Sequence, residues 1–581
     1  MFNIISTLVS ITLITYALVI ILTPVFRKKI SAKHLGILYI ITSGLFTLTL
    51  ILCAKFCFFE SKVFAYNFDN FTKGTNLVDL SLNFSIDSLG LSFAFLVGLI
   101  AFTTNIYTLT YFRGEADESN FMFWLNSFVL SMIILVFAGN FFTIFLGWEL
   151  IGITSFFLIN FWRTRRGVVK SSFKAVVFNL VSDIFLLSSL VSFYQAYHTT
   201  NCVVFINLLN TVPSDNFYTI FGLTCLVICS SIKSVQLIGH LWLPDSMEAP
   251  VPASSLIHSA TLVSAGIYLL CKFNPLIVYV GATTALISIG AITAAYGGVV
   301  AAAQTDMKKL LAYSTMSHCG FLWILASSGN FVITILYLYL HGIFKAATFY
   351  CAGSFIRAYN TQDTRWMGSG ASFLRLDSFL LVFCAANLAG LPFSMGAMYK
   401  VFFIKLLLTQ TVVWWQLGFI FIGLASSIVY FYRLINYAVF DYYKGAKVFP
   451  NYVSLFTIVK QTNLRFTTRN HLLAVFFLLF FALVVTYILY WGLKQNISMY
   501  EVIYEELSTS VVAVKQLEYL HISYVILFYI LYFVLFVLLC LVVCRPNIFA
   551  IETVLTLLYF SLIIGFFSLS CEVILWQKLI Q

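Results

Sequence analysis

The chain has 581 residues, of which 61% are hydrophobic and only 9% are charged. A soluble domain carries roughly 25% charged residues, so this composition excludes a water-soluble globular protein. The net charge of +11 comes from basic residues in short connections between apolar runs, without a basic patch of interleaved aromatic residues, so nucleic-acid binding is not expected. The twelve cysteines include no C-x-x-C pair, and neither a metal site nor a disulfide framework is predicted.

Apolar segments of the length that a helix needs to cross a bilayer recur along the whole chain. Because lipid offers the backbone no hydrogen-bond partners, these segments are expected to be helices. The first one lacks a basic start and a small-residue cleavage site, and we interpret it as a retained helix rather than a signal peptide. The sixteen candidate helices lie at 4–25, 35–59, 85–111, 121–139, 140–162, 172–196, 217–240, 252–273, 277–303, 310–328, 331–356, 374–409, 412–438, 470–493, 521–544 and 550–578. The sequence therefore predicts an all-α polytopic membrane protein with about 14–16 transmembrane helices.

The basic connections agree with this count. They lie at 27–33, 163–170, 308–309, 357–375 and 444–469, and each follows an odd-numbered segment. If every segment crosses the membrane once, all of them lie on one side. The positive-inside rule assigns that side to the matrix or the cytoplasm and leaves the N-terminus outside.

Two of the apolar segments contain helix-breaking residues. Gly239 and Pro244 follow Lys233, and Gly390 and Pro392 interrupt the segment 374–409. Interrupted helices at membrane depth mark ion sites in transporters, and two of them, five helices apart, indicate two related half-units. The expected division is 1–120 for N-terminal transmembrane helices, 121–273 and 274–440 for the two half-units, and 441–581 for C-terminal helices.

Several charged residues lie inside the apolar segments, where a charge costs about 2.5–3.5 kcal/mol. Glu149 lies in the middle of its segment. It is interpreted either as a proton-relay carboxylate or as the structural partner of a buried lysine. Asp183 lies deep in the next segment, while Lys174 lies near its start, where an interfacial role competes evenly with a relay role. Lys233 and Lys400 each lie near an interruption, and for Lys233 a relay role competes with a lysine that extends to the surface.

Polar residues also share helix faces further along the chain. His258 lies on a stripe of serine and threonine, where a structural histidine and a hydrated path are equally favoured. Tyr337, His341 and Lys345 follow one another at i,i+4 spacing, which packing alone does not explain. Lys308 heads the segment TDMKKLLAYSTMSH, where an interfacial anchor and a relay group carry equal weight.

Five sequence blocks between residues 85 and 410 resemble a known family. They are GWELIG, WLPDSMEAPVPASSLIHSATLVSAGIYL, DMKKLLAYST, HGIFKAATFYCAGSFI and GLPFSMGAMYK. The chain resembles the chain 5 family of mitochondrial NADH–ubiquinone oxidoreductase (complex I), its bacterial counterpart and the multisubunit sodium/proton antiporters.

The resemblance implies two inverted five-helix units around a hydrophilic axis at mid-membrane. In that axis Glu149 and Lys233 would form the first half-channel pair, and His258 would link the halves. Lys308, His341 and Lys345 would continue the connection to Lys400 as the exit-side proton site. Asp183, Lys174 and Tyr337 are expected to support these groups.

The resemblance further implies a proton-translocating subunit of NADH:ubiquinone reductase, with no redox chemistry, cofactor or metal in this chain. NADH, FMN, iron–sulfur clusters and ubiquinone would belong to partner subunits. The expected partners are the other membrane-arm subunits, including the sibling chains 4 and 2, and lipids such as cardiolipin. The expected location is the mitochondrial inner membrane as a multi-pass protein, with a bacterial plasma membrane as the alternative. A sodium/proton antiporter subunit and a purely structural membrane subunit are the competing hypotheses.

The chain departs from the family pattern at several positions. Ile238 stands in place of a proline after the segment IKSVQ, Val401 replaces an acidic residue, and Tyr337 replaces a histidine one turn before His341. The first departure predicts a displaced helix break. Near the C-terminus there is room for only one of a lateral helix and a final anchor, and whether 550–578 spans the membrane is left open.

Overall fold

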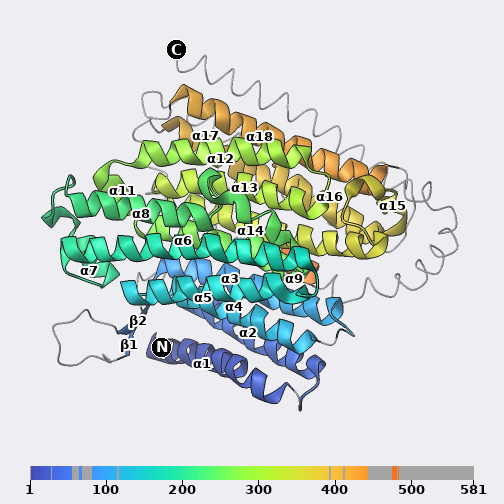
Figure 1. Ribbon diagram of the computed structural model, residues 1–581, viewed down its shortest axis with the longest axis horizontal. Helices are drawn as coiled ribbons and strands as arrows, with labels where there is room; N and C mark the ends of the chain where they lie inside the picture. The colour runs from blue at the N-terminus through green and yellow to red at the C-terminus, as the bar shows by residue number, and fades with distance from the viewer. Residues whose placement is uncertain are drawn as a thin grey trace.

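The computed structural model describes residues 2–27, 29–54, 64–68, 81–113, 115, 117–391, 394–409, 413–441, 474–480 and 482. Its long helices run side by side and form a bundle (Figure 1). Within the described residues, twelve helices are long and apolar enough to cross a membrane. The predicted all-α membrane architecture is therefore confirmed, and the candidate helices at 521–544 and 550–578, with nearly all of 470–493, lie outside the described residues.

The N-terminal region contains three long helices and one short hairpin. Their bounds are α1 (Phe2–Phe26), α2 (Ala32–Ala54), β1 (Phe64–Phe68), β2 (Leu82–Ile86) and α3 (Ser88–Tyr111). The two strands pair antiparallel, with Phe64 opposite Ile86. The Asp87 side chain caps α3 by accepting a hydrogen bond from the Gly90 amide, which satisfies one of the free donors at the helix start. The hairpin was not predicted from the sequence.

The next region covers the first expected half-unit. Its elements are α4 (Glu118–Val136), α5 (Phe141–Ile159), η2 (Asn160–Trp162), α6 (Arg166–Tyr197), α7 (Cys202–Asn207), η3 (Leu209–Thr211), α8 (Phe217–Lys233), η4 (Leu237–Trp242), η5 (Asp245–Glu248), α9 (Val251–Ser259) and α10 (Leu262–Lys272). Asn140 and Thr143 form a reciprocal capping box that starts α5. Every residue of α9 and α10 is buried, so this interrupted helix lies in the interior of the bundle.

The second expected half-unit follows directly. Its elements are α11 (Asn274–Val280), α12 (Thr283–Ala303), α13 (Met307–Ser327), α14 (Phe331–Tyr359), η6 (Thr364–Trp366), α15 (Gly370–Phe373), α16 (Arg375–Ala389), α17 (Met395–Thr409), α18 (Trp414–Ile435) and the π-helical turn η7 (Asn436–Phe440). Glycine allows α12 and α13 to pack closely, since a Cβ on Gly297 would lie 2.7 Å from the Ser317 amide nitrogen. Helix α13 is almost entirely buried.

Three interruptions divide helices at the centre of the bundle. Helix α8 ends at Lys233, and Val235 then adopts a positive φ of 60°. Helix α16 ends at Ala389, where Gly390 adopts the left-handed conformation at φ 72°. Both interruptions were predicted, and Pro392 lies outside the described residues. The first break begins before Ile238, as the missing proline at that position had predicted. The third break lies between α9 and α10, where Thr261 has φ −114° and ψ −94°. It was not predicted, because neither glycine nor proline marks it.

The arrangement has a repeated feature. In the range 121–273 the fourth long helix is α8 with the two short 3₁₀ helices that follow it, and in the range 274–440 the fourth is the pair α16 and α17. Each range therefore has five long helices with an interruption at the same place in the order. The domain boundaries and the inverted relation of the two ranges stay predictions.

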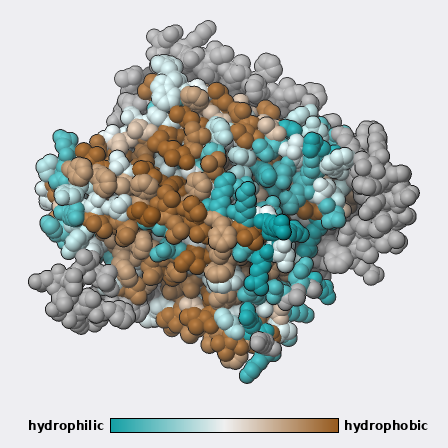
Figure 2. Space-filling model, viewed as in Figure 1, coloured by the Kyte–Doolittle hydropathy of each residue, from teal (hydrophilic) through white to brown (hydrophobic). Residues whose placement is uncertain are grey.

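The surface agrees with a protein that crosses a membrane. Figure 2 shows hydrophobic residues across the middle of one face and hydrophilic residues gathered toward both sides. Large apolar side chains on α6 contribute exposed surface, among them Phe173, Val177 and Ile184. A continuous apolar exterior of this kind is expected where lipid or another membrane protein covers the surface.

Candidate functional site: a row of buried lysines

Five lysines are buried within the described residues, and four of them, each on a different helix, are lysines that the sequence had singled out. The exposed fractions are 0% for Lys233, 2% for Lys308, 0% for Lys345 and 7% for Lys400. Each ammonium group donates to a backbone carbonyl oxygen of another segment. A buried charge is tolerated only when its polar partners compensate for the lost water, so the position of these carbonyls decides how the site works.

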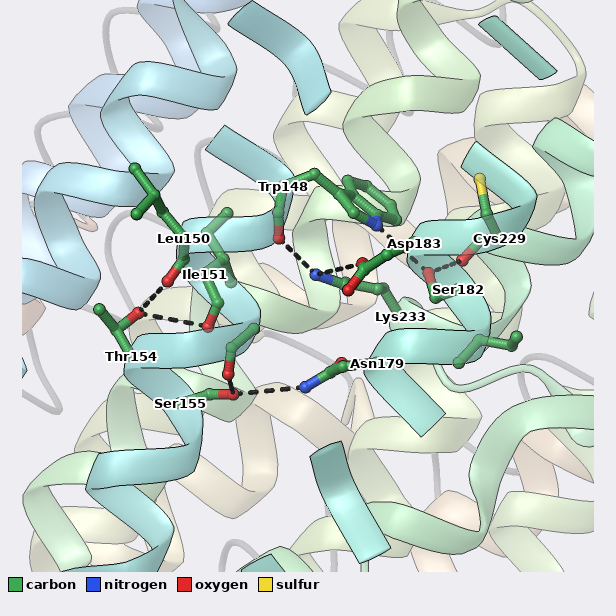
Figure 3. Close-up of polar contacts among 12 residues, drawn as sticks. Trp148, Leu150, Ile151, Thr154, Ser155, Asn179, Ser182, Asp183, Cys229 and Lys233 are labelled. Atoms are coloured by element: carbon green, nitrogen blue, oxygen red, sulfur yellow. Dashed lines mark hydrogen bonds and ion pairs between the residues drawn. The ribbon is translucent and has the colours of Figure 1, made fainter. Parts of the chain in front are cut away.

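The Lys233 group lies between α5, α6 and α8 (Figure 3). Its Nζ donates to the Trp148 carbonyl oxygen at 2.7 Å and lies 3.9 Å from Oδ1 of Asp183. It also lies 4.6 Å from the centre of the Trp148 ring. The Trp148 indole donates to the Ser182 hydroxyl at 3.2 Å, and that hydroxyl donates to the Cys229 carbonyl oxygen at 3.1 Å. These bonds hold the indole against the ammonium group.

The carboxylate within ion-pair distance of Lys233 is Asp183, in contrast to the expected pair of Lys233 with Glu149. Glu149 is half-buried, follows Trp148 in α5, and interacts electrostatically with both Lys233 and Asp183. Asn179 lies on the same face of α6 as Asp183, but its amide donates to the Ser155 hydroxyl at 3.5 Å. The site therefore contains one lysine and two acidic groups, with Asp183 the nearer one.

Lys174 lies apart from this group. Its Nζ forms a 2.6 Å ion pair with Oδ2 of Asp245, and the two side chains are 40% and 39% exposed. The pair connects α6 to η5, the second of the two 3₁₀ helices that follow α8. Lys174 therefore contacts the interrupted segment. It is not a partner of Asp183, and its position on another face of α6 had indicated this.

The structure distinguishes Lys308 from its neighbour Lys309. The Lys308 ammonium donates to the carbonyl oxygens of Met247 at 3.1 Å and Ala249 at 3.0 Å. Lys309 is partly exposed, and its backbone amide donates to Asp306, which caps α13. Burial raises the pKa of the Asp306 carboxyl. Lys308 thus connects α13 to the interrupted segment, while Lys309 lies near the helix end at the surface.

His258 and His341 connect α9 to α14. Nε2 of His341 lies 3.2 Å from the carbonyl oxygen of His258, and since a carbonyl only accepts, the imidazole is the donor. That carbonyl lies in the last turn before α9 ends. The His258 ring stacks on Phe349, and its Nε2 lies 3.4 Å from the Ser246 hydroxyl. The unpredicted break between α9 and α10 therefore places a polar backbone group beside His341.

Lys345 lies one turn after His341 on α14. Its ammonium donates to the Leu311 carbonyl oxygen at 3.2 Å and forms a short hydrogen bond with the Ser314 hydroxyl, both on α13. The Phe431 ring of α18 lies 5.7 Å from Nζ. No ion pair of Lys345 with a carboxylate occurs within the part of the chain that the structure describes.

Lys400 occupies the corresponding place beside the second interruption. It donates to the Ala389 carbonyl oxygen at 2.7 Å and contacts the Ser427 hydroxyl at 3.0 Å. Ala389 is the last residue of α16, so the interruption makes its carbonyl available. A Cβ on Gly390 would lie 2.5 Å from Cδ of Lys400, which explains why glycine suits this turn.

Sequence reasoning missed one titratable residue of this region, His318 on α13. It is fully buried, and its Nδ1 lies 2.9 Å from the Tyr337 hydroxyl. Its ring centre lies 5.2 Å from that of His341. The signal was present, because His318 lies four residues after Ser314 and therefore shares its helix face.

Comparisons with known proteins identify the family of this chain. A sequence model of the family described as "NADH:quinone oxidoreductase/Mrp antiporter, TM" matches residues 138–429, half of the chain. A chain 5 of NADH-ubiquinone oxidoreductase from Paramecium tetraurelia is 40% identical over 447 residues, covering 74% of this chain and 77% of the relative. This chain belongs to the NADH-ubiquinone oxidoreductase chain 5 family.

Other members of the family show similar identity over shorter ranges. The chain 5 of Cryphonectria parasitica is 37% identical over 54% of this chain and 48% of its own length. That of Acanthamoeba castellanii is 34% identical over 63% of this chain and 56% of its own length. These matches therefore span about half the length of each relative.

A solved structure supports the fold independently. A chain in the structure of the membrane-bound sulfane sulfur reductase, an archaeal respiratory membrane complex, aligns with a TM-score of 0.66 at 16% identity. The alignment covers 81% of this chain and 97% of that chain. At this identity the likeness concerns the fold alone.

Proposed function

We propose that the row of buried lysines, together with Asp183, Glu149, His258 and His341, carries protons through the membrane. The observation that carries this proposal is that these four buried lysines donate to backbone carbonyls. The carbonyl oxygens that accept from Lys308 and from Lys400 belong to interrupted segments. A carbonyl stabilises the charged ammonium group but does not form a permanent ion pair with it. Lysines held in this way can gain and lose protons with modest rearrangement.

The cost of these groups favours a functional role over a structural one. An isolated charge in the centre of a membrane costs about 2.5–3.5 kcal/mol, so four of them would oppose insertion by about 10 kcal/mol. Well-packed apolar residues would support the bundle without this cost. The lysines are therefore expected to be present because they transfer protons.

As a member of the chain 5 family, this chain is a proton-pumping membrane-arm subunit of NADH:ubiquinone oxidoreductase. It is a multi-pass protein of the mitochondrial inner membrane. The redox reaction takes place in partner subunits, which hold NADH, FMN, iron–sulfur clusters and ubiquinone. The neighbours in the membrane arm include the sibling chains 4 and 2, and the apolar exterior contacts lipids such as cardiolipin.

The first experiment determines whether the chain is part of this assembly. Membranes are solubilised gently, separated on a native gel, stained for NADH dehydrogenase activity and probed for this chain. Comigration with a very large NADH-oxidising band is expected. Migration in a smaller band without NADH activity would contradict the proposal and favour a sodium/proton antiporter, which a sodium-dependent proton-exchange assay would then test.

A pair of adjacent lysines gives a matched test of the proton path. Lys308→Met removes a buried ammonium group and should lower NADH:ubiquinone turnover and proton pumping together by at least about fivefold. This is a lower bound, because a positioned proton-transfer group typically contributes about 10²–10⁴-fold. Lys309→Met changes the neighbouring, partly exposed lysine and should leave both unchanged. Equal activity of the two assembled variants would contradict a relay role for Lys308.

A further inference from the structure

Helix α13 carries a buried imidazole, that of His318, which contacts α14. His318 is fully buried, and its Nδ1 lies 2.9 Å from the Tyr337 hydroxyl of α14. Its Nε2 has no hydrogen-bond partner within the described residues. A buried polar atom without a partner is costly, so a histidine at this position calls for an explanation beyond packing.

The neighbouring histidine is arranged in a complementary way. His341 donates from Nε2 to the His258 carbonyl oxygen, so the neutral ring has a bare Nδ1. That Nδ1 also lacks a hydrogen-bond partner in the described part of the chain. The centres of the His318 and His341 rings are 5.2 Å apart. Two imidazoles, each with one ring nitrogen unused, therefore lie side by side on different helices.

Tyr337 lies one turn before His341 on α14, and its ring contacts the helix that carries Lys400. The ring centres of Tyr337 and Phe403 are 6.3 Å apart, and Phe403 lies three residues after Lys400 on α17. Lys400 also belongs to the electrostatic surroundings of His318, together with His341 and Lys345. The contacts of His341 with His318 and of His318 with Tyr337 thus connect α14 and α13 to a residue beside α17, which carries Lys400.

We propose that His318 is a relay residue that passes protons from His341 to the Tyr337 hydroxyl, on the way to Lys400. This inference rests on the proposed function and names a further group of the same path. A proton arriving from the His341 side bonds to Nε2 of His318. In the tautomer that carries its proton on Nδ1, His318 then gives that proton to the Tyr337 oxygen, which releases its own hydroxyl proton toward Lys400. One proton enters and one leaves, and His318 keeps the incoming proton on Nε2. Proton exchange between its two ring nitrogens restores the first tautomer before the next transfer.

The test compares variants in the assembled complex. His318→Gln keeps a polar side chain of similar length but has no ring to relay a proton, and it should lower coupled proton pumping at least fivefold. His198→Gln makes the same chemical change at an exposed helix end and should leave pumping unchanged. NADH oxidation with ferricyanide, which bypasses the membrane arm, should be equal in all variants. Normal pumping by assembled His318→Gln would overturn the proposal.

A second variant separates a relay from a structural role. Tyr337→His added to His318→Gln moves the imidazole from α13 to α14, where it lies one turn before His341. The double variant should recover at least half of the lost pumping, because the new imidazole takes the place of both the His318 ring and the Tyr337 hydroxyl on the path from His341 to Lys400. Failure of this rescue in a complex that assembles normally would show that an imidazole at this place does not carry the proton, and would overturn the relay.

Lys345→Met distinguishes this proposal from the function on which it rests. If Lys345→Met lowers pumping but His318→Gln does not, the proton path stands and the relay through His318 is wrong. If neither variant changes pumping, the proposed function of the lysine row fails as well.

Discussion

The two interrupted helices each place a lysine in the interior, but they surround it with different chemistry. Lys233 has the carboxylate of Asp183 at 3.9 Å and the further charge of Glu149 in its surroundings. Lys400 has the Ala389 carbonyl oxygen at 2.7 Å and the Ser427 hydroxyl at 3.0 Å, and no ion pair of Lys400 occurs within the described residues. Similar backbone geometry thus supports a charge-compensated site in one half and a neutral, dipolar site in the other.

If protons follow the proposed path, this difference favours movement in one direction. A nearby carboxylate strongly stabilises the charged ammonium group in a low-dielectric interior, while a carbonyl or hydroxyl dipole does so weakly. The first lysine is therefore suited to hold a proton and the last one to release it. The departure at position 401, where Val401 stands instead of an acidic residue, agrees with a release site without its own carboxylate.

The largest effect is expected from removing the release site. Lys400→Met deletes the ammonium group while keeping a flexible apolar chain of similar length. NADH:ubiquinone turnover of the assembled complex should fall by at least about tenfold, since a positioned proton-transfer group contributes about 10²–10⁴-fold. NADH oxidation with ferricyanide serves as the control for assembly. Turnover above half of the wild-type rate would contradict an exit role for Lys400.

A slightly smaller effect should follow from making the two sites alike. Ser427→Asp places a carboxylate beside the Lys400 ammonium group, where two charges about 4 Å apart attract by about 4 kcal/mol at an intermediate dielectric. The proton would then be held too firmly, and turnover should fall severalfold. Ser427→Asn has nearly the same shape without charge and should retain most activity. Equal turnover in the two variants would show that the missing carboxylate does not matter.

The converse change weakens the first site. Asp183→Asn removes the nearer carboxylate, but Lys233 keeps the Trp148 carbonyl oxygen and the charge of Glu149. Turnover is therefore expected to fall by about three- to tenfold, equivalent to about 1 kcal/mol. Adding Glu149→Gln should lower it further in the assembled complex. If Glu149→Gln alone has the larger effect, the geometry of Asp183 is not the deciding feature of this site.

The smallest effect is expected in the exposed connection between α14 and α16, outside the membrane. The Arg365 guanidinium donates to the Asp363 carboxylate and lowers the pKa of that carboxyl. Its stabilisation is present at neutral pH and is lost as pH falls through the lowered pKa. Asp363→Asn should therefore have little effect on stability, and the same effect at about pH 6 and pH 8. Thermal unfolding of the solubilised complex measures this, and a strong dependence in that range would contradict the assignment.

Much of the architecture followed from local properties of the chain. Apolar length placed all thirteen candidate helices from 4–25 to 412–438 on helices of the structure, with 374–409 divided as Gly390 had predicted. The break after Lys233 was also predicted, because helix-breaking residues act through their own backbone preferences. The break at Thr261 escaped prediction, since neither glycine nor proline marks it.

The chemistry of the site depended more on the fold. The sequence alone identified buried charged residues such as Lys233, Lys345 and Lys400, because a charge in an apolar segment stands out wherever it packs. Only the tertiary structure decided that the carboxylate within ion-pair distance of Lys233 belongs to Asp183 rather than to Glu149. It also decided that Lys308 is buried while Lys309 is partly exposed. It also brought His318 beside His341. Partners on different helices depend on how those helices rotate and pack, and residue order within a single segment does not determine that.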